Sequence, residues 1–115
     1  ELYSTDINLE IPMYKIGTFI PASHLEAVKQ SMFAAGAGRI GHYDCCAWQT
    51  LGQGQFRPLQ HSQPFIGQQG KIETVEEYRV EMVCDESLIK AVIAAMKQAH
   101  PYETPAYDVW QLADV

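Results

Sequence analysis

Two segments of this sequence each run from a strand pattern directly into an amphipathic helix pattern, and that repeated order limits the folds open to the chain. The first segment predicts a strand over Met13–Ile20, followed by a helix that opens at Pro21 and stops at Gly36. The second predicts a long strand over Lys71–Cys84 and a helix over Glu86–Ala99. Both helices are therefore expected on one face of a sheet.

The starts of both helices carry side chains suited to capping. Ser23 with Glu26 three residues later predicts a capping box at the first helix, and Asp85 predicts an N-cap for the second. Each helix also has an apolar face at helical spacing. The residues of these faces are Leu25, Val28 and Met32 in the first helix and Leu88, Val92, Ala95, Met96 and Ala99 in the second.

The middle of the chain predicts further strands. We interpret His42–Thr50 as a central strand covered on both faces, and a tight connection at 51–54 then leads to an antiparallel return over Gln55–Leu59. Residues 60–70 predict a surface loop of a length that often carries function, and a bulge is expected near Glu76. With a last strand at Tyr107–Leu112, the order is β-α-β-β-β-α-β, or β-α-β-β-α-β with an extended middle hairpin. This is the ferredoxin-like arrangement of an α+β domain.

The size and charge of the chain bound its class. Its 115 residues correspond to one domain, which we assign to residues 13–115. Residues 1–12 are interpreted as a leader that is either foreign to the native protein or an additional edge strand. A net charge of −6 argues against nucleic acid as a partner, and no apolar run reaches the roughly 18 residues of a membrane span. Three cysteines without C-x-x-C spacing indicate reduced thiols and a cytoplasmic location.

Two helices on one face of the sheet leave the opposite face uncovered in so small a domain. Four aromatic residues are available to line that face: Trp48, Trp110, Tyr43 and Phe56. A large exposed apolar face favours association with further copies of the chain. We therefore predict a homo-oligomer, either a dimer or a trimer.

A glycine-rich segment, Gly36–Gly41, formally matches the G-x-G-x-x-G pattern of dinucleotide-binding folds. In those folds the pattern follows a strand and precedes a helix, whereas here a helix precedes it, so we reject that interpretation. The glycines predict a helix-to-strand turn with positive φ angles. Their bare N–H groups leave open an anion site formed by Gly36, Gly38, Arg39 and Gly41.

The segment His100–Asp108 holds a histidine, two acids, two tyrosines and two prolines, and the prolines make it a stiff bend. In one interpretation His100 caps the preceding helix as a cation, and Glu103 pairs with backbone N–H groups of the bend. In another, His100, Tyr102 and Glu103 line a site for a small molecule or an anion.

A divalent transition metal is the third interpretation of the bend. His42 and His100 would meet if their strand and helix ends share one end of the sheet, and Glu103 or a thiol of Cys45 or Cys46 would complete the ligand set. No nucleophile with a neighbouring base is visible, so no catalytic residue is assigned. The other polar candidates are interpreted as solvated: His24, His61, Glu73, Glu76, Glu77 and Glu81.

Four motifs now carry a resemblance to a known family. They are Gly36–Tyr43, Gly52–Pro58, Glu77–Glu81 and His100–Asp108. In this order and spacing, from Met13 to Leu112, the chain resembles the domain inserted in bacterial NIF-three-like proteins of the YqfO/YbgI type, here as a stand-alone small protein. It departs from the family at position 42, where the family commonly has Asn and this chain has His.

The resemblance implies a PII/CutA-like fold, which commonly trimerises through its sheets, so a trimer is favoured over a dimer. It implies no catalytic site, because the family's two-metal centre lies in flanking domains. We therefore expect a non-enzymatic regulatory or ligand-sensing module with a small-molecule or anionic ligand between subunits. Two alternatives stay open: a metal-dependent hydrolase related to the full-length NIF-three-like proteins, and a protein-assembly module.

Overall fold

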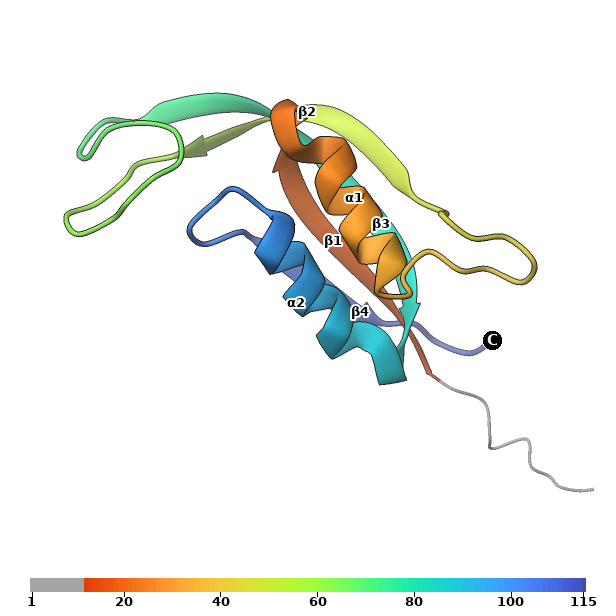
Figure 1. Ribbon diagram of the computed structural model, residues 1–115. Helices are drawn as coiled ribbons and strands as arrows, with labels where there is room; N and C mark the ends of the chain where they lie inside the picture. The colour runs from red at the N-terminus through yellow and green to blue at the C-terminus, as the bar shows by residue number, and fades with distance from the viewer. Residues whose placement is uncertain (1–11) are drawn as a thin grey trace, which may run out of the picture.

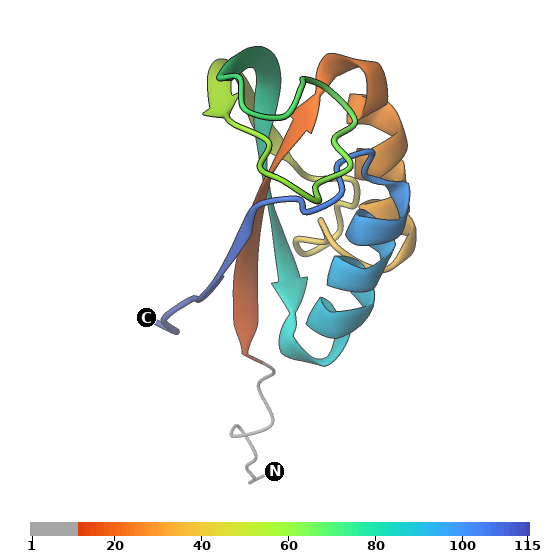
Figure 2. The same cartoon turned by 90° about the vertical axis from the view of Figure 1, so that its left-hand side faces the viewer.

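In the computed structural model, which describes residues 12–115, four strands form one antiparallel sheet with two helices on one side (Figures 1 and 2). The order is β-α-β-β-α-β, so the predicted ferredoxin-like α+β fold with an extended middle hairpin is confirmed. The leader prediction for residues 1–11 lies outside the described residues. The elements are β1 (Met13–Pro21), α1 (Leu25–Ala34), β2 (Trp48–Phe56), β3 (Glu73–Asp85), α2 (Ile89–Ala99) and β4 (Tyr107–Gln111).

The strands lie in the order β2-β3-β1-β4, and every neighbouring pair is antiparallel. The pairing of β1 with β3 ends at Pro21 opposite Glu77. Beyond that point β2 and β3 continue as a pair to Phe56 opposite Glu73. The hairpin of β2 and β3 therefore projects past the end of β1, as the long arm in Figure 1 shows.

The core lies between the sheet and the helices because alternate strand residues point toward the helices. Ile16 and Ile20 of β1 and Val80 of β3 are fully buried there, opposite Val28 of α1 and Val92 of α2. The predicted apolar faces of both helices supply much of this core. Of the three free cysteines only Cys84 is buried.

The prediction for the middle strands was wrong in its boundaries. β2 is one uninterrupted strand that starts at Trp48, so the segment 51–54 makes no tight connection, and residues 42–46 are a loop. β2 is also an edge strand and not a central one. The expected bulge near Glu76 is absent because β3 pairs with β2 in one register from Glu81 to Glu73. A long partner strand pairs with β2 along its whole length, which overrides the turn signal of its two glycines.

The predicted side-chain caps of the helices are also not formed. Each helix begins through a short 3-10 turn, Ala22–His24 or Glu86–Leu88, without a side-chain cap hydrogen bond. The Ser23 hydroxyl lies 2.8 Å from Nδ1 of His24 instead. A 3-10 turn bonds the first N–H groups to nearby carbonyls, which reduces the need for a side-chain cap.

The C-terminal end of α1 follows the prediction. Gly36 has a φ of 113°, and its N–H donates to the Phe33 carbonyl at 3.0 Å. The N–H of Ala37 donates to the Met32 carbonyl at 3.1 Å. These two bonds form a Schellman motif, which needs a residue of positive φ where Gly36 stands.

No helix within residues 12–115 is long and apolar enough to cross a membrane.

Candidate functional site

A cavity of about 280 Å³ lies between two segments that are far apart in the sequence. One is the hairpin loop, residues 57–72, which connects β2 to β3, and the other is the bend, residues 100–106, which connects α2 to β4. The two loops lie at the same end of the molecule in Figures 1 and 2. The cavity is lined mainly by aromatic and apolar side chains with two carboxylates, and its main lining residues are Phe19, Phe56, Phe65, Tyr102, Glu77 and Glu103.

The bend begins at His100, where Pro101 forces the backbone out of the helix. His100 has φ −75° and ψ 136°, and its N–H makes the last helical bond, to the Met96 carbonyl at 2.9 Å. This extended geometry is what a residue before proline adopts. The predicted helix end at Ala99 is therefore confirmed.

The imidazole of His100 is buried and joins three elements. Its Nε2 lies 2.6 Å from the Phe19 carbonyl of β1, and its Nδ1 accepts the Tyr102 N–H at 3.1 Å. Because a carbonyl only accepts and an N–H only donates, these partners select the neutral Nε2–H tautomer. Burial lowers the pKa of His100 below its ordinary value, against the opposing effect of the Phe19 carbonyl. His100 thus ends the helix as a neutral ring, and the interpretation as a dipole-complementing cation was wrong.

The far end of the bend is tied to β1 as well. The fully buried Thr18 hydroxyl donates to the Ala106 carbonyl at 2.9 Å. A buried hydroxyl without a partner would cost free energy, so this bond also explains how Thr18 is tolerated in the core. The bend is therefore held against β1 at both ends.

Tyr102 links the bend to the projecting arm of the β2–β3 hairpin. Its hydroxyl donates to Oε2 of Glu77 at 3.0 Å, and its ring centroid lies 4.7 Å from that of His100. Burial and the bond to Glu77 raise the pKa of Tyr102, so the phenol stays protonated at neutral pH. A Cβ added at Gly54 would collide with the Glu77 carboxylate, so glycine in β2 makes room for that group.

The hairpin loop is attached to the bend by two contacts. The backbone N–H of Gln63 donates to Oε1 of Glu103 at 2.8 Å. The Phe65 ring lies between His24 and Tyr102, with centroid distances of 5.4 Å and 6.4 Å. His24 is consequently half-buried, in contrast to the prediction that it is solvated, whereas His61 is exposed as predicted.

Of the residues predicted to bind a ligand, those of the bend come together. Tyr102 and Glu103 line the cavity, and His100 supports Tyr102 from the core side. Glu103 pairs with a backbone N–H of the hairpin loop and not, as one interpretation had it, with the bend itself.

The glycine turn Gly36–Gly41 lies at the other end of the sheet from the bend (Figure 1). Its N–H groups are partly consumed: Gly36 donates to Phe33, and Gly38 donates to the Val83 carbonyl at 2.8 Å. Of the four residues of the predicted anion site, Arg39 and Gly41 are therefore the two whose backbone N–H groups are not used in these bonds.

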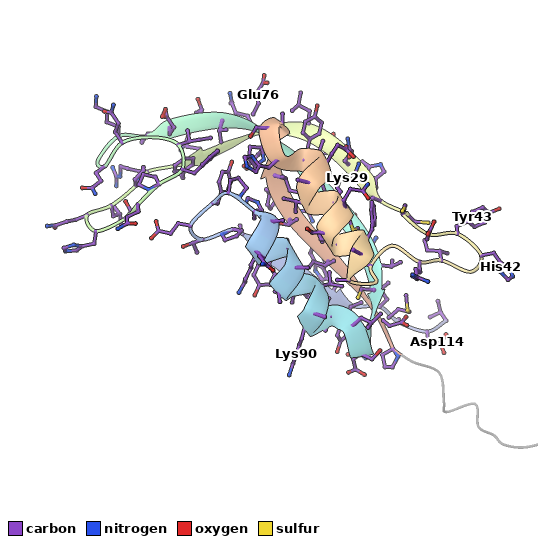
Figure 3. All side chains as sticks on the ribbon, viewed as in Figure 1. Lys29, His42, Tyr43, Glu76, Lys90 and Asp114 are labelled. Carbon is purple, nitrogen blue, oxygen red and sulfur yellow. The ribbon has the colours of Figure 1, made fainter. Side chains whose placement is uncertain are left out.

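The predicted metal ligands do not meet within one chain. His42 is exposed at the tip of the loop between α1 and β2, far from the bend that carries His100 and Glu103 (Figures 1 and 3). Within residues 12–115, no group of three His, Cys, Asp or Glu side chains is placed to hold a metal ion.

Sequence reasoning missed Glu77, which it interpreted as part of a solvated acidic strand face. The glutamates of β3 instead divide: Glu77 bonds Tyr102, while Glu81 pairs with Lys15 and Arg79 at 3.8 Å and 3.0 Å. The signal for Glu77 in the sequence was the pair of glycines in β2, because a strand position without a side chain leaves room for a neighbouring side chain. Phe65 was a second signal, since a large apolar ring in a polar loop is expected to pack against another part of the protein.

The sheet face opposite the helices is the second notable surface, and we call it the open face. The Arg79 guanidinium lies over the Phe19 and Trp110 rings, 5.2 Å and 5.7 Å from their centroids, and it pairs with Glu81. Trp48 on β2 is 57% exposed. The open face therefore mixes aromatic rings with a charged cluster. Of the residues expected on it, Tyr43 lies instead in the α1–β2 loop (Figure 3), and Phe56, on the same side of β2 as Trp48, lines the cavity.

The fold belongs to the CutA/PII class, as comparison with known proteins shows. Residues 65–115 match the family model of the CutA1 divalent ion tolerance protein. The crystal structure of CutA from Xylella fastidiosa aligns with a TM-score of 0.66 at 21% identity, over 90% of this chain and 86% of that one. At that identity the likeness concerns the fold.

A second group of relatives is similar in sequence as well. A "GTP cyclohydrolase 1 type 2 homolog" of Halalkalibacterium halodurans is 43% identical over 102 residues, which are 89% of this chain and 27% of that protein. The crystal structure of a Bacillus cereus protein related to NIF3 aligns with a TM-score of 0.78 at 40% identity, over 90% of this chain and 26% of that one. The predicted relationship to NIF-three-like proteins is confirmed. The chain spans about a quarter of the length of these relatives.

The lowered pKa of His100 predicts a pH-dependent stability. Between the ordinary histidine value of 6.5 and the lowered pKa of His100, the unfolded chain binds a proton that the folded chain excludes. The free energy of unfolding should therefore fall as the pH drops below about 6.5. Urea denaturation at several pH values measures this, and His100→Gln should flatten the slope while the exposed-site control His61→Gln should keep it. Equal slopes for the wild type and His100→Gln would contradict the assignment.

Proposed function

We propose that this chain is a non-enzymatic regulatory or ligand-sensing module whose ligand enters the cavity between the hairpin loop and the bend. The observation that supports this most is the make-up of the cavity wall. It combines aromatic rings with a few fixed polar groups, which is the usual composition of a small-molecule site. One wall is the bend, held to β1 by His100 and Thr18, and the other is a long loop held by few contacts.

A path of contacts supports a role in sensing. Phe19 lines the cavity, and the Arg79 guanidinium lies over its ring and over Trp110 on the open face. A ligand that shifts Phe19 would therefore change a charged and aromatic cluster on an exposed surface. Ligand binding would in this way alter what the open face can associate with.

The partner proposed for the open face is a second copy of the chain. Trp48 and Trp110 lie on opposite edge strands and are 57% and 43% exposed. Aromatic and arginine side chains are enriched at protein interfaces. We favour a trimer over a dimer, on the fold resemblance stated above. A role in assembly with another protein would use this same face and is the second candidate.

The name of the full-length relatives raises GTP as a ligand, and the cavity argues against it. A triphosphate needs cationic or N–H partners, whereas the charged side chains that line the cavity are Glu77 and Glu103. For the metal-dependent hydrolase, no observation within residues 12–115 offers a ligand set.

Blocking the cavity tests the ligand-sensing proposal. Ala106 lines the cavity with an exposed side chain, so Ala106→Trp should fill the space without loss of the fold. A thermal-shift screen of a metabolite library should find compounds that stabilise the wild type and leave Ala106→Trp unaffected. Asp108→Asn, an exposed change outside the cavity, should respond like the wild type. A library without any such compound would contradict the proposal.

A matched pair of variants tests the proposed self-association. Trp48 and Leu51 lie in the same strand with similar exposure, 57% and 52%, but Trp48 belongs to the open face and Leu51 to the helix side. Sedimentation or light scattering should give a wild-type mass above that of one chain. Trp48→Lys should lower that mass, and Leu51→Lys should leave it unchanged. A monomeric wild type would contradict the proposal.

A further inference from the structure

We infer that the cavity selects a small organic cation, such as a protonated amine or a guanidinium group, attached to a flat apolar body. This inference rests on the proposed ligand-sensing function and names the chemical class of the ligand. It departs from the expectation of an anionic ligand that the glycine-rich turn suggested.

The charge of the wall favours a cationic ligand. Glu77 and Glu103 are the charged residues that line the cavity, and no Lys, Arg or His of the described chain is among the lining residues. Arg57, between the lining residues Phe56 and Pro58, does not contribute to the wall. Since the whole chain carries a net charge of −6, the surrounding potential also attracts cations.

The balance of hydrogen-bond donors and acceptors in the wall also favours a cation. The Tyr102 hydroxyl already donates to Glu77, and the Ser62 hydroxyl already donates to the Leu59 carbonyl at 2.6 Å. Glu103 uses Oε1 for the Gln63 N–H. A carboxylate has about four acceptor positions, so both glutamates keep acceptor capacity after these bonds. The wall therefore offers mostly acceptors, which a ligand with several N–H donors satisfies.

The aromatic content of the wall favours the same class of ligand. Phe56, Phe65 and Tyr102 present ring surface to the cavity. A cation over an aromatic face gains electrostatic energy, and the same rings bury the apolar body of a ligand. This protein already uses such a contact next to the cavity, where Arg79 lies over Phe19.

An inorganic divalent ion fits this wall less well. Calcium takes at least about six oxygen ligands and magnesium an octahedral set, whereas two carboxylates and aromatic rings line this cavity. Within residues 12–115, no group of three metal-ligating side chains is found. An organic cation makes use of both the carboxylates and the rings.

Three probes of similar size test the charge preference. Benzylammonium, benzyl alcohol and benzoate share one ring and differ in charge, and each can be titrated into the ¹⁵N-labelled full chain at pH 7. We expect benzylammonium to shift the amide signals of Gln63 and Tyr102 in a saturable way. Benzyl alcohol should bind about tenfold more weakly, since it carries no positive charge to pair with the carboxylates, and benzoate should not bind.

Carboxylate variants assign the preference to the cavity. Glu77→Gln and Glu103→Gln should each weaken benzylammonium binding by about tenfold and leave the binding of benzyl alcohol unchanged. Glu76→Gln removes the same charge one residue away on an exposed part of β3 that does not line the cavity, so it should bind benzylammonium like the wild type. Unchanged amide signals in the core would show that each variant is folded.

The contrary outcomes separate this inference from the proposed function. Equal or tighter binding of benzyl alcohol or benzoate, or equal weakening by Glu76→Gln, would overturn the cation preference and leave a ligand-sensing cavity standing. No response to any of the three probes would also overturn the preference. The proposed function itself falls only if the library screen finds no compound that depends on an open cavity.

Discussion

The candidate site depends on the two hydrogen bonds made by the buried, neutral imidazole of His100. One ring nitrogen bonds the Phe19 carbonyl of β1, and the other accepts the Tyr102 N–H of the bend. These bonds fix Tyr102, which in turn meets Glu77 on the arm of the hairpin and Phe65 of the hairpin loop. A protonated ring would present two donors, so the Tyr102 N–H would lose its acceptor. The shape of the cavity thus depends on a histidine that does not line it.

The second constraint is the length of the hairpin. β2 and β3 pair beyond the end of β1, and the projecting arm brings the hairpin loop to the same end of the molecule as the bend. Glu77 lies opposite Pro21, the last residue of β1. Without that projection, no wall would lie beyond Glu77. The cavity therefore arises from a local excess of strand length together with a proline-stiffened bend.

The sequence predicted the elements whose signals are local. Alternation identified β1 and β3, helical spacing identified α1 and α2, and Gly36 and Pro101 marked the helix ends. The middle of the chain was harder, because Gly52 and Gly54 carry a turn signal but are paired along their whole strand with β3. Long-range pairing decided that case, and a single sequence does not show it.

The candidate site was predictable in part. The bend was identified from its prolines and polar groups, and the hairpin loop from its length. Their contact was not foreseen, because it depends on how far the hairpin projects. For the same reason Glu77 was assigned to solvent, although it bonds Tyr102. His42 was brought to His100, although the loop that carries His42 and the bend lie at opposite ends of the molecule (Figures 1 and 3). Side-chain chemistry was visible in the sequence, whereas the juxtaposition of loops required the fold.

Closure of the hairpin loop on the bend is the central claim, and ring-to-ring nuclear Overhauser effects test it most directly. In the ligand-free protein at neutral pH, the ring protons of Phe65 should show cross-peaks to those of both Tyr102 and His24. The centroid distances of 6.4 Å and 5.4 Å bring ring edges close enough for such transfer. A Phe65 ring with the chemical shifts of a free side chain and no cross-peak to either partner would contradict the account.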